Sequence, residues 1–231
     1  RYRLPEPVAA YLSVGGRWIA SFEAVPEPWD GTWTLVAYSL PQEETYRRRR
    51  LRGQLRWHGF APLYDGLWVS ARPPYAVVES ELRAATGGAT TLFRARHVDV
   101  GAVTGRGPLA AWDLDAIAAM YAEFLQVWAP VADRAARGRI EGGDAVRART
   151  EVMDTYRRFP LLDPRLPAEL LPPDWPRGEA REVFMAVYDG LAGAAEAHVR
   201  RLAVDSGAKD DDIRAHTVAD LLAGLGGGCN A

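Results

Sequence analysis

The sequence predicts an α+β protein in which a ferredoxin-like β-α-β-β-α-β domain is followed by an all-helical C-terminal domain. Three observations lead to this prediction. Short β-rich apolar runs alternate with two helix-forming segments over residues 33–100. A glycine-rich stretch follows at 101–107. Beyond it, apolar residues recur at helical spacing, so we predict domains at 29–105 and 106–231.

The first strand is predicted at 33–40. The turn-forming sequence Trp29-Asp30-Gly31-Thr32 precedes it, its residues are apolar on both faces, and Pro41 ends it. A helix is predicted over 43–57, because this segment has good helix formers, apolar residues at roughly helical spacing and a terminating glycine, Gly59. We therefore expect a buried strand followed by a helix.

A hairpin, a second helix and a last strand complete the sheet domain. Strands at 60–64 and 67–70 flank Asp65-Gly66, the dipeptide that type I′ turns require because both central residues have positive φ. Residues 75–85 carry apolar residues at helical spacing and end at two glycines, and 90–100 returns as a strand. This order predicts one antiparallel sheet packed against two helices.

Three helices are predicted in the second half of the chain. Asp113 can cap the first, whose length Pro130 limits. Asp144 can cap the second, which Pro160 ends. The third, over 180–202, has the most regular apolar stripe, and acidic residues lie in its first turn where the helix dipole favours them.

Two further segments are less regular. Residues 161–176 contain too many prolines for a helix and too many apolar residues for a free loop, so we expect them to pack along the helices. The acidic run 210–212 opens a predicted short helix that extends into the glycines at 224–228. We expect the tail beyond it to be loose.

Charge and composition exclude several classes of protein. With 28 Lys and Arg residues against 30 Asp and Glu residues, the net charge of -2 argues against nonspecific phosphate binding by the whole surface. The single cysteine, Cys229, excludes an internal disulfide and a cysteine-rich zinc site. Because no apolar run reaches the ~20 residues that span a bilayer, we expect no membrane partner and a cytoplasmic location.

No pattern of residues predicts a catalytic or metal site. The four histidines lie far apart in the sequence and form neither an H-x-x-x-H nor an H-E-x-x-H pair. The sequence also lacks the G-x-S-x-G and G-x-x-x-x-G-K-[ST] motifs, and isolated aspartates are more often caps or turn residues than catalytic pairs. We therefore predict no enzymatic activity, no metal and no cofactor.

The basic cluster of the sequence is Arg47–Arg50 together with Arg52 and Arg56. Successive helical residues are about 100° apart, so four consecutive arginines cannot form a single stripe. Two interpretations stay open: a solvated helix face that pairs with Glu43 and Glu44, or contact with an anionic ligand or the DNA backbone. The eight tryptophans are likewise either core residues or walls of a pocket for flat apolar groups.

Six short segments carry a resemblance to a known family. They are Trp29-Asp-Gly-Thr-Trp33, Arg52-Gly-Gln-Leu-Arg-Trp-His-Gly-Phe60, Gly66-Leu-Trp-Val-Ser70, Tyr156-Arg-Arg-Phe159, Asp163-Pro-Arg-Leu-Pro167 and Leu170-Leu-Pro-Pro-Asp-Trp175. Together they extend from about Trp29 to Leu202, and in this combination the sequence resembles the PaaX family of bacterial transcriptional repressors, named for control of phenylacetic acid catabolism.

The resemblance implies a three-part repressor with an N-terminal winged-helix DNA-binding domain, a central ferredoxin-like dimerisation domain and a C-terminal helical domain. Residues 1–28 would then be the end of the wing and a linker, with most of the winged-helix domain missing and Arg1 and Arg3 as candidate DNA contacts. Operator DNA would bind through that missing domain. The family's inducers imply an acyl-CoA effector such as phenylacetyl-CoA.

For such a thioester, arginines would hold the CoA phosphates and aromatic side chains would enclose the aryl group. The candidates are Arg56, Arg157 and Arg158 for phosphate, and Trp57, Trp68, Tyr156 and Trp175 for the apolar end. Each also has a structural interpretation, such as a core position for Tyr156 or an Arg157–Asp163 pair. In a homodimer, an effector that favours one dimer geometry would release the DNA.

Two alternative functions stay open. One is an effector-binding and dimerisation module without DNA binding. The other is a metal-dependent nuclease, because ferredoxin-like domains also occur in small nucleases. Such a nuclease needs an acidic residue at the end of the first strand to hold the metal ion. The sequence Tyr38-Ser39-Leu40-Pro41 contains none there.

Overall fold

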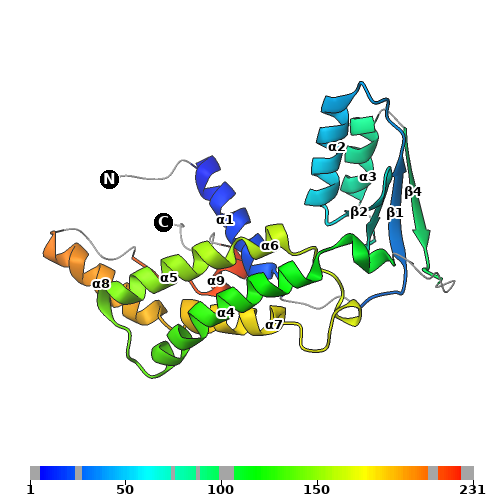
Figure 1. The fold of residues 1–231 in the computed structure, drawn as a ribbon. Coiled ribbons are helices and arrows are strands. Elements are labelled where there is room, and N and C mark those ends of the chain that lie inside the picture. Colours follow the sequence, from blue (N-terminus) through cyan, green and yellow to red (C-terminus); the bar gives the residue numbers. More distant parts are fainter. Residues whose placement is uncertain are drawn as a thin grey trace. The chain divides into compact units, whose positions relative to one another are not determined.

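The computed structural model describes residues 6–23, 28–73, 76–86, 89–98, 107–207 and 213–224. By its internal contacts the chain forms two compact units (Figure 1). The helical unit comprises residues 1–25, 118–160 and 175–231, and the sheet unit comprises 26–117 and 161–174. Each unit therefore combines segments that are distant in the sequence. The domain limits at 105 and 106 stay a prediction.

The sheet unit contains the predicted β-α-β-β-α-β order. Its elements are β1 (Trp33–Tyr38), α2 (Thr45–Trp57), β2 (Ala61–Tyr64), β3 (Leu67–Ser70), α3 (Ala76–Thr86) and β4 (Thr90–Ala95). The strands lie in the order β2-β3-β1-β4, and each neighbouring pair is antiparallel. This topology confirms the predicted fold class. The last strand is shorter than predicted, since residues 96–98 are not part of it.

The hairpin between β2 and β3 turns at the predicted Asp65-Gly66 dipeptide. Gly66 has a φ of +78°, a backbone conformation that side chains other than glycine's rarely adopt. The N–H of Tyr38 donates a 3.0 Å hydrogen bond to the carbonyl oxygen of Gly66. A Cβ atom on this glycine would lie 3.1 Å from the carbonyl oxygen of Tyr38. The glycine therefore allows the turn to approach the end of β1 closely.

One face of the sheet is covered by α2 and α3, which lie side by side (Figure 1). The buried cluster between these layers consists of Val36, Tyr38, Leu40, Leu51, Leu55, Phe60, Trp68, Val78 and Leu82. Leu51 and Leu55 are one helical turn apart, so both side chains of α2 point to the sheet. Val36 and Tyr38 meet them because alternate residues of a strand share a face.

The opposite face of the sheet is covered by two segments that lie outside the β-α-β-β-α-β order. Its buried cluster consists of Trp33, Leu63, Val69, Ala71 and Leu166. The first covering segment contains the short 3-10 helix η1 (Pro108–Ala111), and the second contains η2 (Ala168–Leu170). Partly buried leucines and tryptophans of these segments pack against the cluster. The prediction that the first strand is apolar on both faces is thereby confirmed.

Residues 161–174 pack in the sheet unit, so the expectation that this segment lies along the helices is wrong. Arg72 donates a 3.3 Å hydrogen bond from Nε to the carbonyl oxygen of Arg165. The backbone N–H of Trp29 donates to Oε1 of Glu169, also at 3.3 Å. The prolines prevent a regular helix. Leu166 is buried, and Leu170 and Leu171 are partly buried, where the sheet offers a second apolar face.

The helical unit has a core of stacked aromatic rings. Its helices are α1 (Glu6–Ser21), α4 (Leu114–Ala136), α5 (Gly142–Tyr156), α6 (Phe159–Leu162), α7 (Arg177–Tyr188), α8 (Ala192–Asp205) and α9 (Val218–Ala223). The rings of Tyr156 and Phe184 are stacked with centroids 4.0 Å apart. The rings of Phe22 and Phe124 lie 6.2 and 6.0 Å from the same tyrosine. These contacts bury Tyr156 at the junction of four segments.

Helix α1 is a finding of the structure, because the sequence analysis assigns no helix to residues 1–28. The helix packs beside α9. Arg181 of α7 donates to the carbonyl oxygens of Ala20 at 3.1 Å and Phe22 at 2.6 Å. Arg177 forms a 2.8 Å ion pair with Glu23. Carbonyl groups at a helix C-terminus have no partner within the helix, so these arginines stabilise the end of α1.

Of the predicted ends of the first two helices of the second half, the cap at Asp113 is confirmed and the others differ. Asp113 caps α4 as predicted, because its Oδ1 atom accepts a 2.9 Å hydrogen bond from the N–H of Ala116. Pro130 lies inside α4 and does not end it. A proline removes one hydrogen bond from a helix, but a long helix that packs along the rest of its length can continue past it. Asp144 lies in the first turn of α5 rather than at its cap, and Pro160 lies within α6.

The predicted third helix is two helices, α7 and α8, separated by residues 189–191. A Cβ atom on Gly190 would collide with a carbonyl oxygen of α7, so the break requires a glycine. The carboxylate of Asp189 accepts a 2.8 Å hydrogen bond from the N–H of Val218, the first residue of α9. That helix is capped by Thr217, whereas the predicted start at 210–212 lies outside the described residues.

Candidate functional site

The outward face of α2 carries a groove bounded by arginine and aromatic side chains. It has a volume of about 520 Å³ and is lined by Tyr46, Arg49, Arg50, Gly53, Gln54 and Trp57. These positions are three or four residues apart, so they share one face of the helix, opposite the buried Leu51 and Leu55. Gly53 has no side chain, so the middle of the groove is open. A Cβ atom at this position would have no neighbouring atom within 4 Å.

Hydrogen bonds and ion pairs divide the arginines of α2 into two groups. Arg47 forms a 2.7 Å ion pair with Glu44. Arg52 donates to the hydroxyl of Tyr38 at 3.2 Å, and this hydrogen bond is the main reason that the pKa of Arg52 is raised. Within the described part of the chain, no carboxylate lies within 4.0 Å of Arg49 or Arg50. Among the arginines that line the groove, these two guanidinium groups are therefore open to an anion.

Two exposed aromatic side chains stand at the ends of the groove. Tyr46 is 75% exposed and Trp57 is 68% exposed. Large aromatic side chains dominate core and interface energetics, and their flat faces stack on other planar groups and on cations. The groove therefore presents positive charge between two aromatic surfaces. This composition suits a ligand that carries both phosphate and a planar group.

Arg56 and Trp68 contact one another but do not line the groove. The guanidinium of Arg56 lies 5.5 Å from the ring centroid of Trp68. Trp68 itself is buried in the cluster beneath α2 and α3. A cation–π contact of this kind holds α2 on the sheet. Of the three predicted ligand-binding residues in the sheet unit, Trp57 is the one that the structure places in the groove.

The predicted ligand-binding residues of the helical unit lie in two different surroundings. Tyr156 is buried in the aromatic core, and the ring of Trp175 lies edge-on to that of Tyr121, with centroids 6.4 Å apart. Arg157 and Arg158 are exposed and both form ion pairs with Asp154, at 2.6 and 3.3 Å.

Asp154 pairs with both of the arginines that follow Tyr156 in the sequence. The hydrogen bond from Arg157 is the largest cause that lowers the pKa of Asp154. Arg157 is thus paired with Asp154 rather than with the expected Asp163, whose Oδ1 accepts a 2.6 Å hydrogen bond from the N–H of Arg165. Arg1 and Arg3, the predicted DNA contacts, lie outside the described residues.

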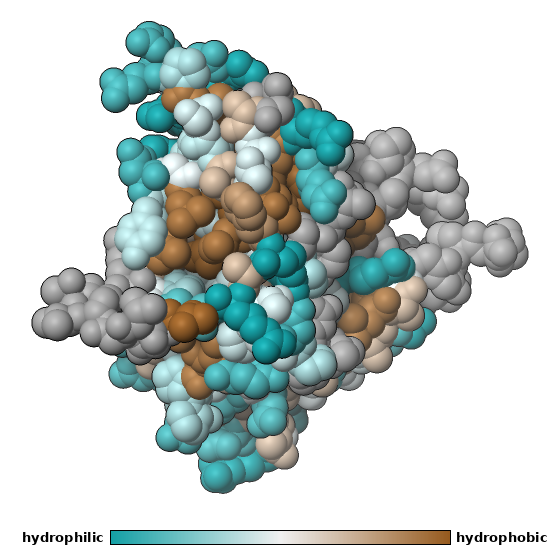
Figure 2. Space-filling view, turned by 90° about the vertical axis from the view of Figure 1, so that its right-hand side faces the viewer, coloured by the Kyte–Doolittle hydropathy of each residue, from teal (hydrophilic) through white to brown (hydrophobic). Residues whose placement is uncertain are grey.

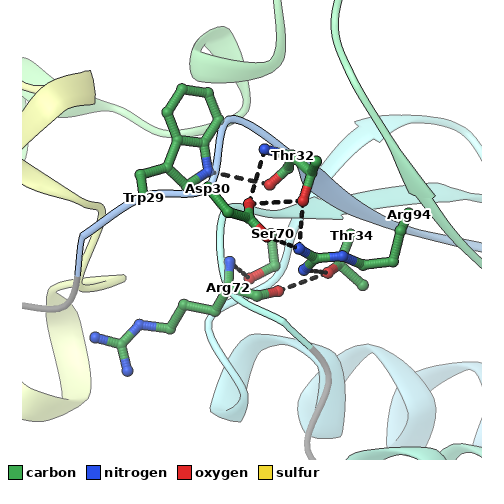
Figure 3. Close-up of polar contacts among 7 residues, drawn as sticks. All are labelled: Trp29, Asp30, Thr32, Thr34, Ser70, Arg72 and Arg94. Carbon is green, nitrogen blue, oxygen red and sulfur yellow. Dashed lines mark hydrogen bonds and ion pairs between the residues drawn. The ribbon is translucent and has the colours of Figure 1, made fainter.

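The turn before β1 is held by a network of polar contacts (Figure 3). Asp30 accepts hydrogen bonds from the N–H of Thr32 at 2.9 Å and from its hydroxyl at 2.7 Å, and it forms an ion pair with Arg94. The indole N–H of Trp29 donates to the carbonyl oxygen of Thr32 at 3.0 Å. Arg94 also donates to the hydroxyl of Thr34 at 3.2 Å. The polar groups of this sequence motif are therefore engaged within the sheet unit.

Neither a metal-binding cluster nor a membrane span is found in the described parts of the chain. They contain no group of three His, Cys, Asp or Glu side chains arranged to hold a metal ion. None of their helices has the length and hydropathy that crossing a membrane requires. At the end of β1, Ser39 and Leu40 follow Tyr38, and Asp30 lies before the opposite end of that strand.

The sequence analysis does not group the residues of the groove, although their helical spacing can be seen in the sequence. Tyr46 is one of the apolar residues whose spacing predicts the helix over 43–57, whereas the structure exposes its side chain. Arg49 and Arg50 are treated as part of a single run of arginines. The signal was the recurrence of large or basic side chains at positions 46, 49–50, 53–54 and 57, a stripe that excludes both buried leucines of α2.

Comparisons with known proteins cover both units. Residues 26–104 match the family model described as the PaaX protein central Cas2-like domain, and residues 112–201 match that of the PaaX-like protein C-terminal domain. Over 185 residues the chain is 29% identical to the Transcriptional repressor PaaX of Escherichia coli (strain K12). This match covers 77% of the chain and 57% of the relative, so the chain spans little more than half of that protein.

A solved structure shows the same fold. It is that of the uncharacterized protein Rv0674 from Mycobacterium tuberculosis, which is 24% identical to the chain, with a TM-score of 0.60. The similarity covers 86% of this chain and 75% of the other. This likeness supports the fold and carries no information about function.

Proposed function

Because the chain carries the central and the C-terminal domain of the PaaX family and thus belongs to it, we propose that it acts as a transcriptional repressor of aromatic-acid catabolism of the phenylacetate type. The observation that carries this proposal is the similarity to a repressor that extends across both units. In the proposed mechanism a homodimer binds operator DNA and an aryl-CoA thioester releases it.

The groove on α2 is the proposed contact for the thioester. Coenzyme A combines phosphate groups with a planar adenine. The groove combines two exposed aromatic rings with two arginines that have no carboxylate partner among the described residues. Arginine binds phosphate through paired N–H groups, and aromatic rings stack on planar groups. In this proposal Arg49 and Arg50 hold phosphate, and Tyr46 and Trp57 stack. A volume of about 520 Å³ lies within the range of ~300–1,000 Å³ of small-molecule sites.

The sheet unit offers a surface for the proposed dimer. In the described sheet, β4 is an edge strand, so one row of its backbone groups has no neighbouring strand. Phe93 of this strand is 50% exposed. Figure 2 shows hydrophobic residues gathered on the sheet unit, in the upper half of the view, with hydrophilic residues around them. Contiguous apolar surface of this kind marks interaction sites, and a second copy can cover it at a two-fold axis.

The dimer would couple effector binding to DNA binding. Two copies place their DNA-binding parts on half-sites about one helical turn of DNA apart. An effector that binds one dimer geometry better shifts the population to that geometry and changes the half-site spacing. Release of DNA then follows from differential affinity of the effector for the two geometries.

Transcript measurement tests the repressor proposal in the organism that encodes the chain. Deletion of the gene should raise the transcripts of aromatic-acid breakdown genes in the absence of an aromatic acid, and complementation should restore repression. Calorimetric titration of the purified chain with phenylacetyl-CoA tests the effector, with free CoA as the control. Unchanged transcript levels in the deletion strain would contradict the proposed repressor function.

The same two experiments identify the second candidate function, a module that binds effector and dimerises without contacting DNA. Thioester binding together with unchanged transcripts is the result that this alternative predicts. The nuclease alternative has no carboxylate at the end of β1 to support it, as the sequence already indicated. A Mg²⁺-dependent cleavage assay on the purified chain tests that alternative directly.

A further inference from the structure

A second cavity lies within the helical unit, between α5 and α8. Its volume is about 380 Å³. It is lined by Val146, Arg149, Thr150 and Met153 of α5, Tyr188 of α7, Ala195, Glu196 and Val199 of α8, and Ile213, Arg214 and Ala215. The α5 residues are spaced by three or four positions, so they form one face of that helix. The wall is thus mainly apolar, with a few polar groups, as in small-molecule sites.

Arg149 is the polar group that distinguishes this cavity. The side chain belongs to a residue that is only 8% exposed. It donates to the carbonyl oxygen of Tyr188, and to that of His216 at 2.6 Å, and its guanidinium lies 4.1 Å from the ring centroid of Tyr188. Among the described residues no carboxylate lies within 4.0 Å of it. Within the part of the chain that the structure describes, this buried positive charge is therefore balanced by carbonyl dipoles and a ring face.

The other charged groups of the wall are already paired. Glu196 accepts hydrogen bonds from the N–H of Ala215 at 2.9 Å and from Nε of Arg200 at 3.0 Å. Arg214 forms a 2.9 Å ion pair with Asp220. A guanidinium has five N–H donors, and the two carbonyl oxygens use two of those of Arg149. The charge that a ligand would meet in this cavity is thus positive.

We propose that this cavity binds a compact organic carboxylate, with its carboxylate at Arg149 and its apolar body between α5 and α8. Burial of a charge without a counter-charge is unfavourable, and a carboxylate would supply the counter-charge in a bidentate geometry that guanidinium favours. The apolar side chains of Val146, Met153, Val199 and Ile213 would contact the body of the ligand. The site is separate from the groove on α2 and does not depend on the repressor proposal.

The three methionines of the chain provide a local readout. They are Met120 in α4, Met153 in the cavity wall and Met185 in α7. In protein labelled with [methyl-13C]methionine, titration with phenylacetate and with hexanoate should shift the Met153 signal in a saturable way for at least one acid, and leave Met120 as an internal reference. The amide of the acid that binds, phenylacetamide or hexanamide, has the same shape without the charge and should bind at least about tenfold more weakly.

Two variants locate the ligand. Val199→Trp should fill the cavity from the α8 side and weaken binding at least about tenfold, whereas Val127→Trp, at an exposed position of α4, should not change it. Arg149→Met should abolish binding. Arg149 also connects three segments. If Arg149→Met does not fold, the affinity of the Val199→Trp variant is the test of the site. Replacing Arg49 and Arg50 by alanine should leave the Met153 shift unchanged, which distinguishes this site from the groove.

Three results would overturn the proposal. They are an unshifted Met153 signal with both acids, equal affinity for the acid that binds and its amide, and unchanged affinity in folded Val199→Trp. Loss of the repressor function in cells would not affect any of them, because the titration uses the purified chain.

Discussion

Asp30 and Arg94 form an ion pair that joins the turn before β1 to the edge strand β4. Asp30 precedes β1 and Arg94 lies in β4, the last strand of the β-α-β-β-α-β order, and β1 and β4 are neighbours in the sheet. Asp30 also accepts two hydrogen bonds from Thr32, which are the largest causes that lower its pKa, ahead of Arg94. One carboxylate therefore holds both the turn and the edge strand (Figure 3).

The Asp30→Asn variant should be less stable at neutral pH by a few degrees in Tm, and this difference should disappear in acid. The pKa of Asp30 is lower in the folded state, so the unfolded state binds the proton more tightly. The contribution is complete above the unfolded pKa of about 3.9 and is lost as the pH falls through the lower folded value. Thermal unfolding from neutral pH to about pH 2 measures this difference in Tm, with Glu123→Gln as the control. A difference that persists at the acid end would contradict this assignment.

The Leu166→Ala variant should lower the free energy of unfolding by about 2–5 kcal/mol, because Leu166 is only 2% exposed among the residues of the sheet's second face. Leu162→Ala, in the same segment but exposed, should change it by about 0.5 kcal/mol or less. Urea denaturation of the two variants gives the comparison. Equal effects of both changes would mean that the segment does not pack on the sheet in solution.

Replacement of both Arg49 and Arg50 by alanine should weaken phenylacetyl-CoA binding at least about tenfold, because it removes two guanidinium groups from the groove. Arg157→Ala should leave the affinity unchanged, since its partner is Asp154. Calorimetry at low and high salt should show that salt weakens binding by the original chain more than by the double variant. If Arg157→Ala had the larger effect, the phosphate site would lie in the helical unit.

The Phe93→Lys variant should convert the proposed dimer to a monomer, because it places a charge on the exposed edge strand. Val127→Lys changes an equally exposed apolar residue of α4 and should leave the dimer intact. Light scattering after size-exclusion chromatography gives the mass of each. A monomeric original chain, or a dimeric Phe93→Lys variant, would move the interface elsewhere.

The sheet unit was predictable because its signals are local. Asp65-Gly66 specifies its own turn, and the glycine at position 66 has the positive φ that the dipeptide indicates. The order of strands and helices over residues 33–95 then follows from short apolar runs separated by such turns. The family resemblance rested in part on the same stretch of sequence and on the turn at Asp30, whose contacts Figure 3 shows.

The candidate site was predictable only in part. Trp57 was singled out from the sequence and lines the groove, whereas Tyr156 and Trp68 are core residues. An aromatic side chain at helical spacing fits either role, so its burial depends on the elements that pack against it. Arg149 gave no signal at all, since its partners, the carbonyl oxygens of Tyr188 and His216, belong to other segments.

The sequence by itself determined the order of elements in the sheet unit, the helical character of the second half and the family to which both domains belong. The tertiary structure alone decided that residues 161–174 cover the second face of the sheet, that one long apolar stripe is split into α7 and α8, and that Arg49, Arg50 and Arg149 lack a carboxylate partner among the described residues. The reason is physical. Turns and helical periodicity depend on neighbouring residues, whereas burial and ion pairing depend on side chains that only folding brings together.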